Sequence, residues 1–391
     1  MDKGKLRIGI LMPSYYMSQT RFPNRICSPR ELGVNLANAL VDRGHDVTVF
    51  STEDTKTRAK LVASSLAFLP TDMDWRKERD RVQVRRKTKK ESQGTMHVEF
   101  ELLSRAYRMA AKGLFDIFHS FHSFGENQHG AHYFEDITGF PTVYTLHNTL
   151  PEKGTPSDAF LERWKHHRFV AISSSQRQKG NLHFTGTVHN GILPEAYPPN
   201  FTDNRKVAYL AWMGRVYAMK GLDDAVRVAI KLHQQLHFAP TNVEQNGDPK
   251  YFEKDVLPLL HRSDYRAFSF LQNSARARFL AQAKVFLFPI HWDEPFGMTM
   301  IEAMATGTPV IAFGRGAVPE VVVSGKTGFI VPESDGIDGL IEAVKKIDAL
   351  SPEEYKEMRK RCRRHVEAHF TVEHMTAGYE AIYRRMLEKK N

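Results

Sequence analysis

The chain has 391 residues, of which 41% are hydrophobic and 26% are charged, and this composition is ordinary for a soluble globular protein of about two domains. No apolar run approaches the roughly 20 residues that a membrane-spanning helix needs, and Cys27 and Cys362, the only cysteines, suggest neither a disulfide framework nor a zinc motif. The formal net charge of +10 leaves nucleic acid, an anionic membrane surface and an anionic substrate open as ligands. The first residues lack a signal-peptide cleavage site, so we expect a cytoplasmic protein.

The first predicted elements are a strand, a helix and a second strand. LRIGILMP, residues 6–13, is a short apolar run that ends in proline, and RGHDVTVFST, residues 43–52, has the same character. Between them, Ser28 and Glu31 have capping-box spacing around a proline at the first helical position, which predicts a helix start. This order is typical of a nucleotide-binding α/β domain.

Three further strands are predicted after a polar, basic insert, at residues 115–121, 141–148 and 168–174. Ligands of open α/β sheets bind outside the carboxyl ends of the strands. His119, His122 and His147 all fall near such ends. A single histidine at a strand end more often has a structural role. Three histidines at neighbouring strand ends suggest that the carboxyl edge of this predicted sheet contains a functional site.

A segment rich in proline, asparagine and aspartate follows, and we place the domain boundary there. The predicted domains are 1–190 and 207–370, with a linker at 191–206 and a final helix at 371–391 that returns to the first domain. The second domain begins with a strand that ends in Gly214. Arg215 and Lys220 follow it, just before the helix that begins at Gly221. Two cations beside a helix start can hold a diphosphate without a metal.

The segment HWDEPFGMTMIEAMATGTPVIAF, residues 291–313, contains the most specific pattern in the chain. It follows the apolar run AKVFLFPI, which predicts a buried parallel strand. Gly297 allows a tight turn into a helix at 299–306, and the free N–H groups at such a helix start attract phosphate. Glu294 precedes the helix and Glu302 lies about one turn inside it. Carboxylates at these two positions can accept hydrogen bonds from sugar hydroxyls.

Together with the downstream GAVPEVVVSGKTGFIV, this block resembles the Glu-x7-Glu signature of retaining glycosyltransferases of the GT-B type, specifically glycosyltransferase family four. The resemblance implies two Rossmann-like α/β domains that face each other across a cleft, with the nucleotide-sugar donor on the second and the acceptor on the first. It implies that Glu294 contacts the donor sugar and Glu302 the ribose. It further implies that the diphosphate is held by Arg215, Lys220, Gly297, Met298 and Thr299.

The chain departs from the family pattern at several places. The Gly-Gly pair of the first turn is replaced by Cys27-Ser28, and the stretch 239–247 contains the polar TNVEQN where the family has an apolar strand. Ser269 stands where the family usually has glycine near the base. The family's Asp-x-x-His-x-His is also altered, so the histidine near the reacting sugar is either His119 or, with a local bulge, His122.

The expected function is transfer of a sugar, with retention, from a nucleoside diphosphate sugar, UDP-sugar by preference, to an unknown carbohydrate, lipid or small-molecule acceptor. The nucleotide sugar is a co-substrate, and neither a cofactor nor a metal is expected. An Asp-x-Asp at residues 71–75 lies outside any clear strand end and is attributed to chance. The alternatives are a sugar-nucleotide epimerase of the same fold and a non-catalytic sugar-nucleotide or nucleic-acid binder, although nucleic acid is not the expected partner.

Two basic runs, at 76–91 and 356–365, carry much of the positive charge. They are interpreted as a solvated loop and a solvated helix face. Peripheral contact with an anionic membrane is the alternative.

Overall fold

The computed structural model describes residues 4–12, 18, 20, 27–65, 81–122, 130–178, 182–203, 205, 208–240, 247–268 and 271–388, without the side chains of 81–95, 122 and 273. The chain divides into two compact units. The first comprises Met1–Ile172, Gln176–His189 and Met375–Asn391, and the second comprises Ser173–Ser175 and Asn190–His374. The Asp-x-Asp at 71–75 and Ser269 lie outside the described residues.

The first unit is built on a seven-stranded sheet in the order β3-β2-β1-β4-β5-β6-β7, and all pairings between these strands are parallel. Its strands are β1 (Arg7–Leu11), β2 (Asp46–Thr52), β3 (Lys60–Ser64), β4 (Ile117–His122), β5 (Thr142–Leu146), β6 (Arg168–Ala171) and β7 (Phe184–Thr187). The strand order reverses between β1 and β4, and this reversal is the place where open α/β sheets bind ligands.

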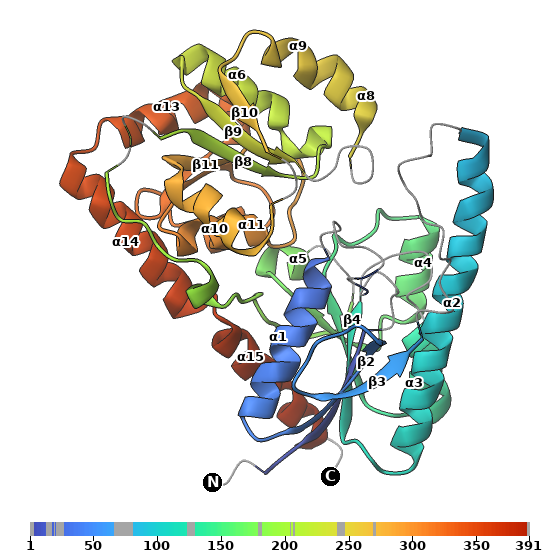
Figure 1. The fold of residues 1–391 in the computed structure, drawn as a ribbon. Coiled ribbons are helices and arrows are strands. Elements are labelled where there is room, and N and C mark those ends of the chain that lie inside the picture. The colour runs from blue at the N-terminus through green and yellow to red at the C-terminus, as the bar shows by residue number, and fades with distance from the viewer. Residues whose placement is uncertain are drawn as a thin grey trace. The chain divides into compact units, whose positions relative to one another are not determined.

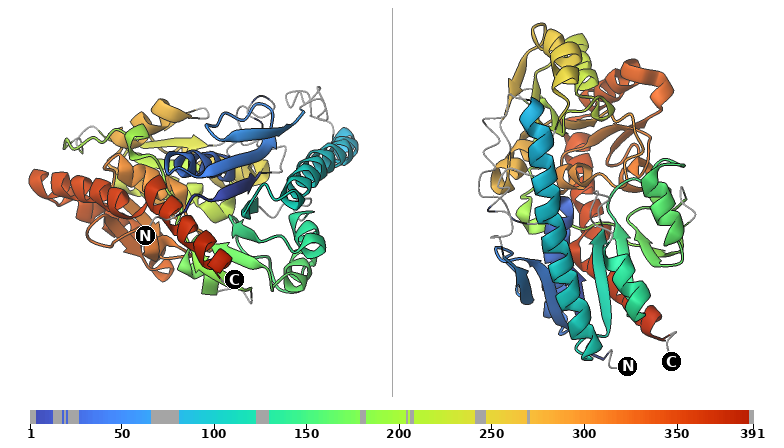
Figure 2. Two further views of the ribbon diagram at one scale, coloured as in Figure 1. Left: turned by 90° about the horizontal axis from the view of Figure 1, so that it is seen from below. Right: turned by 90° about the vertical axis from the view of Figure 1, so that its right-hand side faces the viewer.

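The helices of the first unit are α1 (Ser28–Asp42), α2 (Arg81–Ala111), α3 (Gly130–Thr138), α4 (Pro156–Arg163) and most of α15 (Val372–Glu388), and the short α5 (Ser174–Gln178) lies at the boundary between the units. The long helix α2 packs beside α3, as Figures 1 and 2 show. The core between helices and sheet is aromatic, with Phe118 in contact with the rings of Phe50 and Tyr107 at centroid distances of 6.1 and 5.1 Å.

The helix predicted from Ser28 is present, but its capping box is not. Cys27 is the N-cap residue, and no side-chain hydrogen bond caps the helix there. The proline at the first turn and the buried positions Leu32, Leu36 and Leu40 are enough to define this helix.

The second unit has a six-stranded parallel sheet in the order β10-β9-β8-β11-β12-β13. Its strands are β8 (Leu210–Gly214), β9 (Leu236–Pro240), β10 (Tyr265–Ala267), β11 (Val285–Phe288), β12 (Val310–Phe313) and β13 (Gly328–Val331). Its α-helices are α6 (Leu222–Leu232), α8 (Pro249–Tyr251), α9 (Leu257–Leu260), α10 (Asn273–Gln282), α11 (Met298–Ala305), α12 (Val318–Val321), α13 (Gly336–Asp348) and α14 (Pro352–His369). Shorter turns of helix are η4 (Pro194–Ala196), η5 (Ala218–Lys220), the π-helical η6 (Phe252–Val256) and η7 (Glu333–Asp335).

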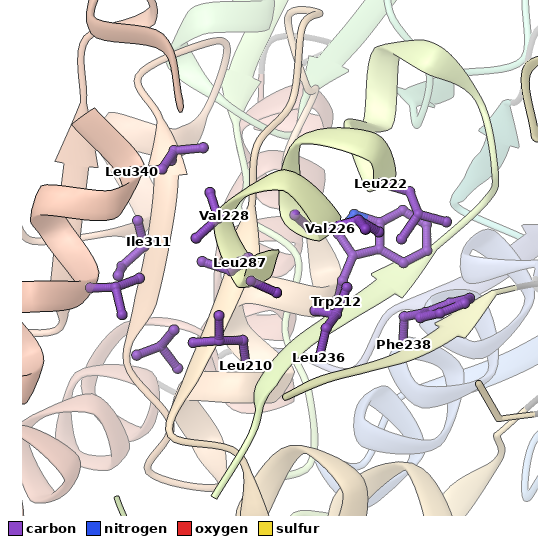
Figure 3. Packing of buried hydrophobic residues seen from close by; sticks show 14 of the residues in the cluster. Leu210, Trp212, Leu222, Val226, Val228, Leu236, Phe238, Leu287, Ile311 and Leu340 are labelled. Carbon is purple, nitrogen blue, oxygen red and sulfur yellow. The ribbon is translucent and has the colours of Figure 1, made fainter. Parts of the chain in front are cut away.

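The core of this unit forms where α6 and α13 cover the sheet, and Figure 3 shows its side chains meeting between strand and helix. Trp212 of β8 and Leu222 and Val226 of α6 are at most 1% exposed. Strand β9, which follows α6, has the sequence LHFAP and ends at Pro240, before the polar stretch, of which residues 241–246 lie outside the description.

The second basic run is only in part the solvated helix face that was predicted, since Lys356 and Arg364 are exposed but two other arginines are not. Arg359 in α14 is 0% exposed and donates hydrogen bonds to the carbonyl oxygens of Asn200, Ala281 and Ala283. Arg363 donates to three further carbonyls. These two guanidinium groups therefore satisfy backbone acceptors within the second unit.

Candidate active site

The second unit brings the predicted donor-binding residues to one edge of its sheet. The strand order reverses between β8 and β11, so the loops that follow these strands lie side by side. Arg215 and Lys220 belong to the loop after β8, and Glu294 belongs to the loop after β11. All three residues therefore lie at the switch point.

The two loops are joined by backbone contacts. The N–H of His291 donates to the carbonyl oxygen of Met219 at 2.9 Å. Gly221 has a φ of 65°, and a Cβ atom there would lie 1.9 Å from the carbonyl oxygen of Pro289. Only glycine permits this approach, so the position of the Lys220 turn depends on it.

Lys220 and Glu294 form an ion pair, with Nζ to Oε2 at 2.5 Å. Their side chains are 13% and 12% exposed. Nζ also lies 4.3 Å from the centre of the Trp292 ring, and Trp292 Nε1 donates to the same carboxylate oxygen at 3.1 Å. The cation and the carboxylate are thus held together where they are largely shielded from solvent, and charge interactions there are stronger than in water.

The pKa of Lys220 is lowered by burial, with a smaller lowering from the nearby Arg215 charge, and Glu294 opposes this shift. Arg215 is exposed, and its guanidinium carbon lies 5.5 Å from the centre of the Tyr217 ring. Two cations that disfavour each other at close range gain stability from an added anion. A diphosphate is such an anion.

The helix predicted beyond Gly297 is α11, and it begins at Met298, one residue earlier than expected. Gly297 is the N-cap in the left-handed conformation, with φ 85° and ψ 65°. The backbone carbonyl of Glu294 accepts a hydrogen bond from Ala317 N at 2.9 Å, which ties the acidic residue to the GAVPE segment. Met298 and Thr299 occupy the first turn, whose N–H groups have no partner within the helix.

Glu302 is placed differently from the other acidic residue. It is 3% exposed, and Arg276 of α10 donates to its Oε1 at 2.9 Å. A carboxylate has about four acceptor sites, so this pair leaves capacity for hydroxyl donors. Sequence reasoning missed Arg276 and Trp292, because no local pattern links either of them to a glutamate.

In the first unit, His119 lies inside β4 and is 0% exposed. Its Nδ1 is 2.6 Å from Tyr383 Oη of α15, and its Nε2 is 2.7 Å from Thr145 Oγ1. Burial places the pKa of His119 well below its usual value, with a smaller contribution from His147. Both ring nitrogens are therefore engaged in hydrogen bonds, Nδ1 with helix α15 and Nε2 with the neighbouring strand β5.

His122 is the last residue of β4, in register with Leu146 of β5. Its backbone thus reaches the carboxyl edge of the sheet beside the switch point. His147 follows β5, and burial lowers its pKa to about 3. Its ring stacks on Phe121 at a centroid distance of 5.1 Å.

Two parallel sheets whose strand orders follow the 3-2-1-4-5-6 pattern, each in its own α/β unit, are the architecture of the GT-B class of glycosyltransferases. Solved structures agree with this fold. The sucrose-phosphate synthase of Thermosynechococcus elongatus superposes with a TM-score of 0.70 at 18% identity, covering 98% of this chain and 100% of the other. A glycosyltransferase from Rickettsia africae ESF-5 gives 0.69 at 16% identity, covering 98% and 99%.

Two family models cover most of the chain. Residues 34–192 match Glycosyltransferase Family 4, and residues 195–366 match Glycosyl transferases group 1. The chain belongs to this family of GT-B glycosyltransferases.

Curated relatives match over shorter stretches. The putative glycosyltransferase YtcC of Bacillus subtilis (strain 168) is 27% identical over 53% of this chain and 56% of its own length. Spore coat protein SA of the same organism is 25% identical over 51% of this chain and 59% of its own length. The chain thus spans somewhat more than half the length of these two relatives.

Among the described residues, none of the helices combines the length and the apolar character needed to cross a bilayer.

Proposed function

We propose that this protein transfers a sugar from a nucleoside diphosphate sugar to an acceptor hydroxyl, with retention at the anomeric carbon. The observation that carries the proposal is the pairing of Lys220 with Glu294 at the switch point, with Arg215 beside it. A sugar diphosphate combines an anionic diphosphate with hydroxyl groups that donate hydrogen bonds. This site places two cations, which suit the diphosphate, close to a carboxylate, which can accept hydrogen bonds from the hydroxyls.

In the proposed reaction, the bond between the anomeric carbon and the diphosphate oxygen breaks, and its electron pair leaves with the diphosphate. Arg215, Lys220 and the backbone amides at 297–299 stabilise the departing charge. The acceptor oxygen bonds to the same face of the anomeric carbon through an oxocarbenium-like state, and its proton passes to the departing phosphate oxygen. Because the two cations supply the positive charge, the proposal requires no metal.

The remaining predicted residues take the following roles in the proposal. Glu294 accepts hydrogen bonds from hydroxyls of the donor sugar, and Glu302 accepts them from the ribose. Of the two histidines, His122 is favoured as the residue beside the reacting sugar, because His119 is fully buried with both ring nitrogens engaged.

UDP-sugar is the proposed donor class. Support comes from HepE of Anabaena, whose structure in complex with UDP-glucose superposes with a TM-score of 0.68 at 14% identity, covering 98% of this chain and 100% of that one. Calorimetric titration with UDP, ADP and GDP tests the base preference, and tighter binding of ADP or GDP would contradict it. Retention is tested by determining the anomeric configuration of the product by NMR, where an inverted product would refute the mechanism.

A further inference from the structure

A second cluster of side chains with metal-binding chemistry lies in the first unit. It consists of Asp136 in α3 and of His166 and His167 in the turn before β6, and one ligand atom from each lies within 4.8 Å of the others. Because β6 begins at Arg168, the cluster lies at the amino edge of the sheet. The carboxyl edge with His122 is about one strand length away, on the order of 13 Å for four residues.

The distances within the cluster suit a tetrahedral ion. Asp136 Oδ1 is 3.4 Å from His167 Nε2 and 3.8 Å from His166 Nε2. Zinc bonds of about 2.0–2.1 Å in a tetrahedral site place neighbouring ligand atoms about 3.4 Å apart. The side chains of Asp136 and His166 are 47% and 63% exposed, so an ion can enter and these two ligands can adjust.

His167, in contrast, is held in one orientation. Its side chain is 4% exposed, its backbone N–H donates to Trp164 O at 2.8 Å, and its ring packs against Trp164 at a centroid distance of 5.1 Å. Nδ1 lies 2.8 Å from His132 Nδ1 and 3.3 Å from Glu135 Oε2. Metal-binding histidines usually donate their second ring N–H to such an acceptor, which fixes the tautomer.

Without an ion, His167 Nε2 lies within hydrogen-bond distance of Asp136 Oδ1, at 3.4 Å. A cation bound between these two atoms would replace this hydrogen bond, and the ring proton would then lie on Nδ1, which faces His132 and Glu135. His132, Glu135 and Asp136 share one face of α3, since they are spaced three and four residues apart. One helix face therefore supplies both a ligand and the groups that orient the buried histidine.

We propose that Asp136, His166 and His167 bind one divalent transition-metal ion, with Zn²⁺ as the best match to two imidazoles and a carboxylate. Water completes the tetrahedron, and His132 and Glu135 act as positioning residues for His167. The ion joins the C-terminal part of α3 to the turn that leads into β6. The site is separate from the proposed donor site, and the inference does not depend on the proposed reaction.

The test uses the untagged, full-length chain after treatment with a chelator. Calorimetric titration with Zn²⁺ and visible absorption with Co²⁺ should show one tightly bound ion per chain in tetrahedral geometry. Asp136→Asn and His166→Ala should each weaken Zn²⁺ binding tenfold or more and abolish the Co²⁺ bands. His261→Ala removes an exposed histidine of the second unit and should bind as the unaltered chain does.

Thermal unfolding provides the second readout. Zn²⁺ should raise the unfolding temperature of the unaltered chain and of His261→Ala, and should leave that of Asp136→Asn unchanged. Without Zn²⁺ all variants should unfold at similar temperatures, because the replaced side chains are exposed. The proposal is overturned if the unaltered chain binds no stoichiometric Zn²⁺, as expected for a purely hydrogen-bonded cluster, or if Asp136→Asn and His166→Ala bind it equally well.

Discussion

Replacement of Lys220 by alanine should weaken nucleoside diphosphate binding strongly. In the structure Lys220 Nζ pairs with Glu294 at 2.5 Å beside the Trp292 ring, and a phosphate bound there would share this cation. Loss of a hydrogen bond to a charged group costs about 1.5–3 kcal/mol, which corresponds to roughly tenfold to 150-fold in affinity. The carboxylate of Glu294 would then face the phosphate without its counter-charge, so the effect should lie toward the upper end.

The same replacement should have a smaller effect on folding. The pair is 13% and 12% exposed, which places it between surface pairs worth about 0–1 kcal/mol and buried pairs whose disruption costs about 3–5 kcal/mol. A loss of about 1–3 kcal/mol of stability is therefore expected, and the second unit should remain folded.

The assay is calorimetric titration with UDP, with thermal unfolding of each variant as the check on folding. Lys231→Ala is the matched control, because Lys231 lies on the adjacent helix α6 in an exposed pair with Asp338 whose side chains are 56% and 82% exposed. The control should bind UDP as the unaltered chain does. If Lys220→Ala and Arg215→Ala both fold and both keep full UDP affinity, the diphosphate assignment is wrong.

Three other outcomes are expected. His122→Ala should lower turnover while UDP affinity stays nearly intact, which is the pattern of an interaction made mainly in the transition state. His119→Ala should chiefly lower stability, because it removes two buried hydrogen bonds. Steady-state kinetics and urea unfolding distinguish these effects, and full turnover in both variants would exclude this strand end as the catalytic centre. Glu294→Gln should change the relative rates with different donor sugars, because an NH₂ group, which donates hydrogen bonds, replaces one carboxylate oxygen that accepts them from sugar hydroxyls. An equal reduction in rate with all donors would argue against contact between Glu294 and the sugar. Lowering the pH from 7 to 5 should cost about 2 kcal/mol of stability at His147, whose folded-state pKa is lowered to about 3 by burial, since the unfolded chain takes up a proton below about pH 6.5 and the folded chain does not. Burial raises the pKa values of Glu99 to about 8 and of Glu135 to about 7, and these groups act in the opposite direction, so the contribution of His147 is isolated by comparing urea unfolding of the unaltered chain with that of His147→Phe. The unaltered chain should lose about 2 kcal/mol more than the variant between pH 7 and pH 5, and an equal loss in both would contradict this.

Strands β8, β11 and β12 could be predicted from sequence because each is a short apolar run next to glycine or proline, and parallel strands covered by helices on both faces are apolar throughout. The turn into α11 was equally predictable, since Gly297 and Pro295 leave the backbone few choices. Local steric rules were thus enough to predict the strands and the turn that carry the proposed donor site.

Contacts between distant segments were not predictable. Arg276 and Glu302 are 26 residues apart, and Arg359 meets carbonyls up to 159 positions away. The cluster of Asp136, His166 and His167 likewise forms only when α3 and the turn before β6 meet. Such pairs have no spacing rule, because the fold and not the local chain brings them together.

The capping box at Ser28 illustrates the opposite error. The spacing of Ser28 and Glu31 satisfied a local rule, yet the structure begins the helix at Ser28 with Cys27 as the N-cap. A boundary displaced by one residue removes the capping geometry, and helix ends are uncertain by about that much when judged from sequence.

The central claim, that this protein cleaves the sugar–phosphate bond of a nucleotide sugar, is tested most directly by measuring nucleoside diphosphate release. The unaltered chain and Arg215→Ala are incubated with a panel that includes UDP-glucose, UDP-N-acetylglucosamine, GDP-mannose and ADP-glucose. We predict release from at least one donor, a UDP-sugar, at a rate that falls at least tenfold in Arg215→Ala. Tight UDP binding without release from any donor above the protein-free rate, even with candidate acceptors present, would contradict the claim and identify a binding protein without transferase activity.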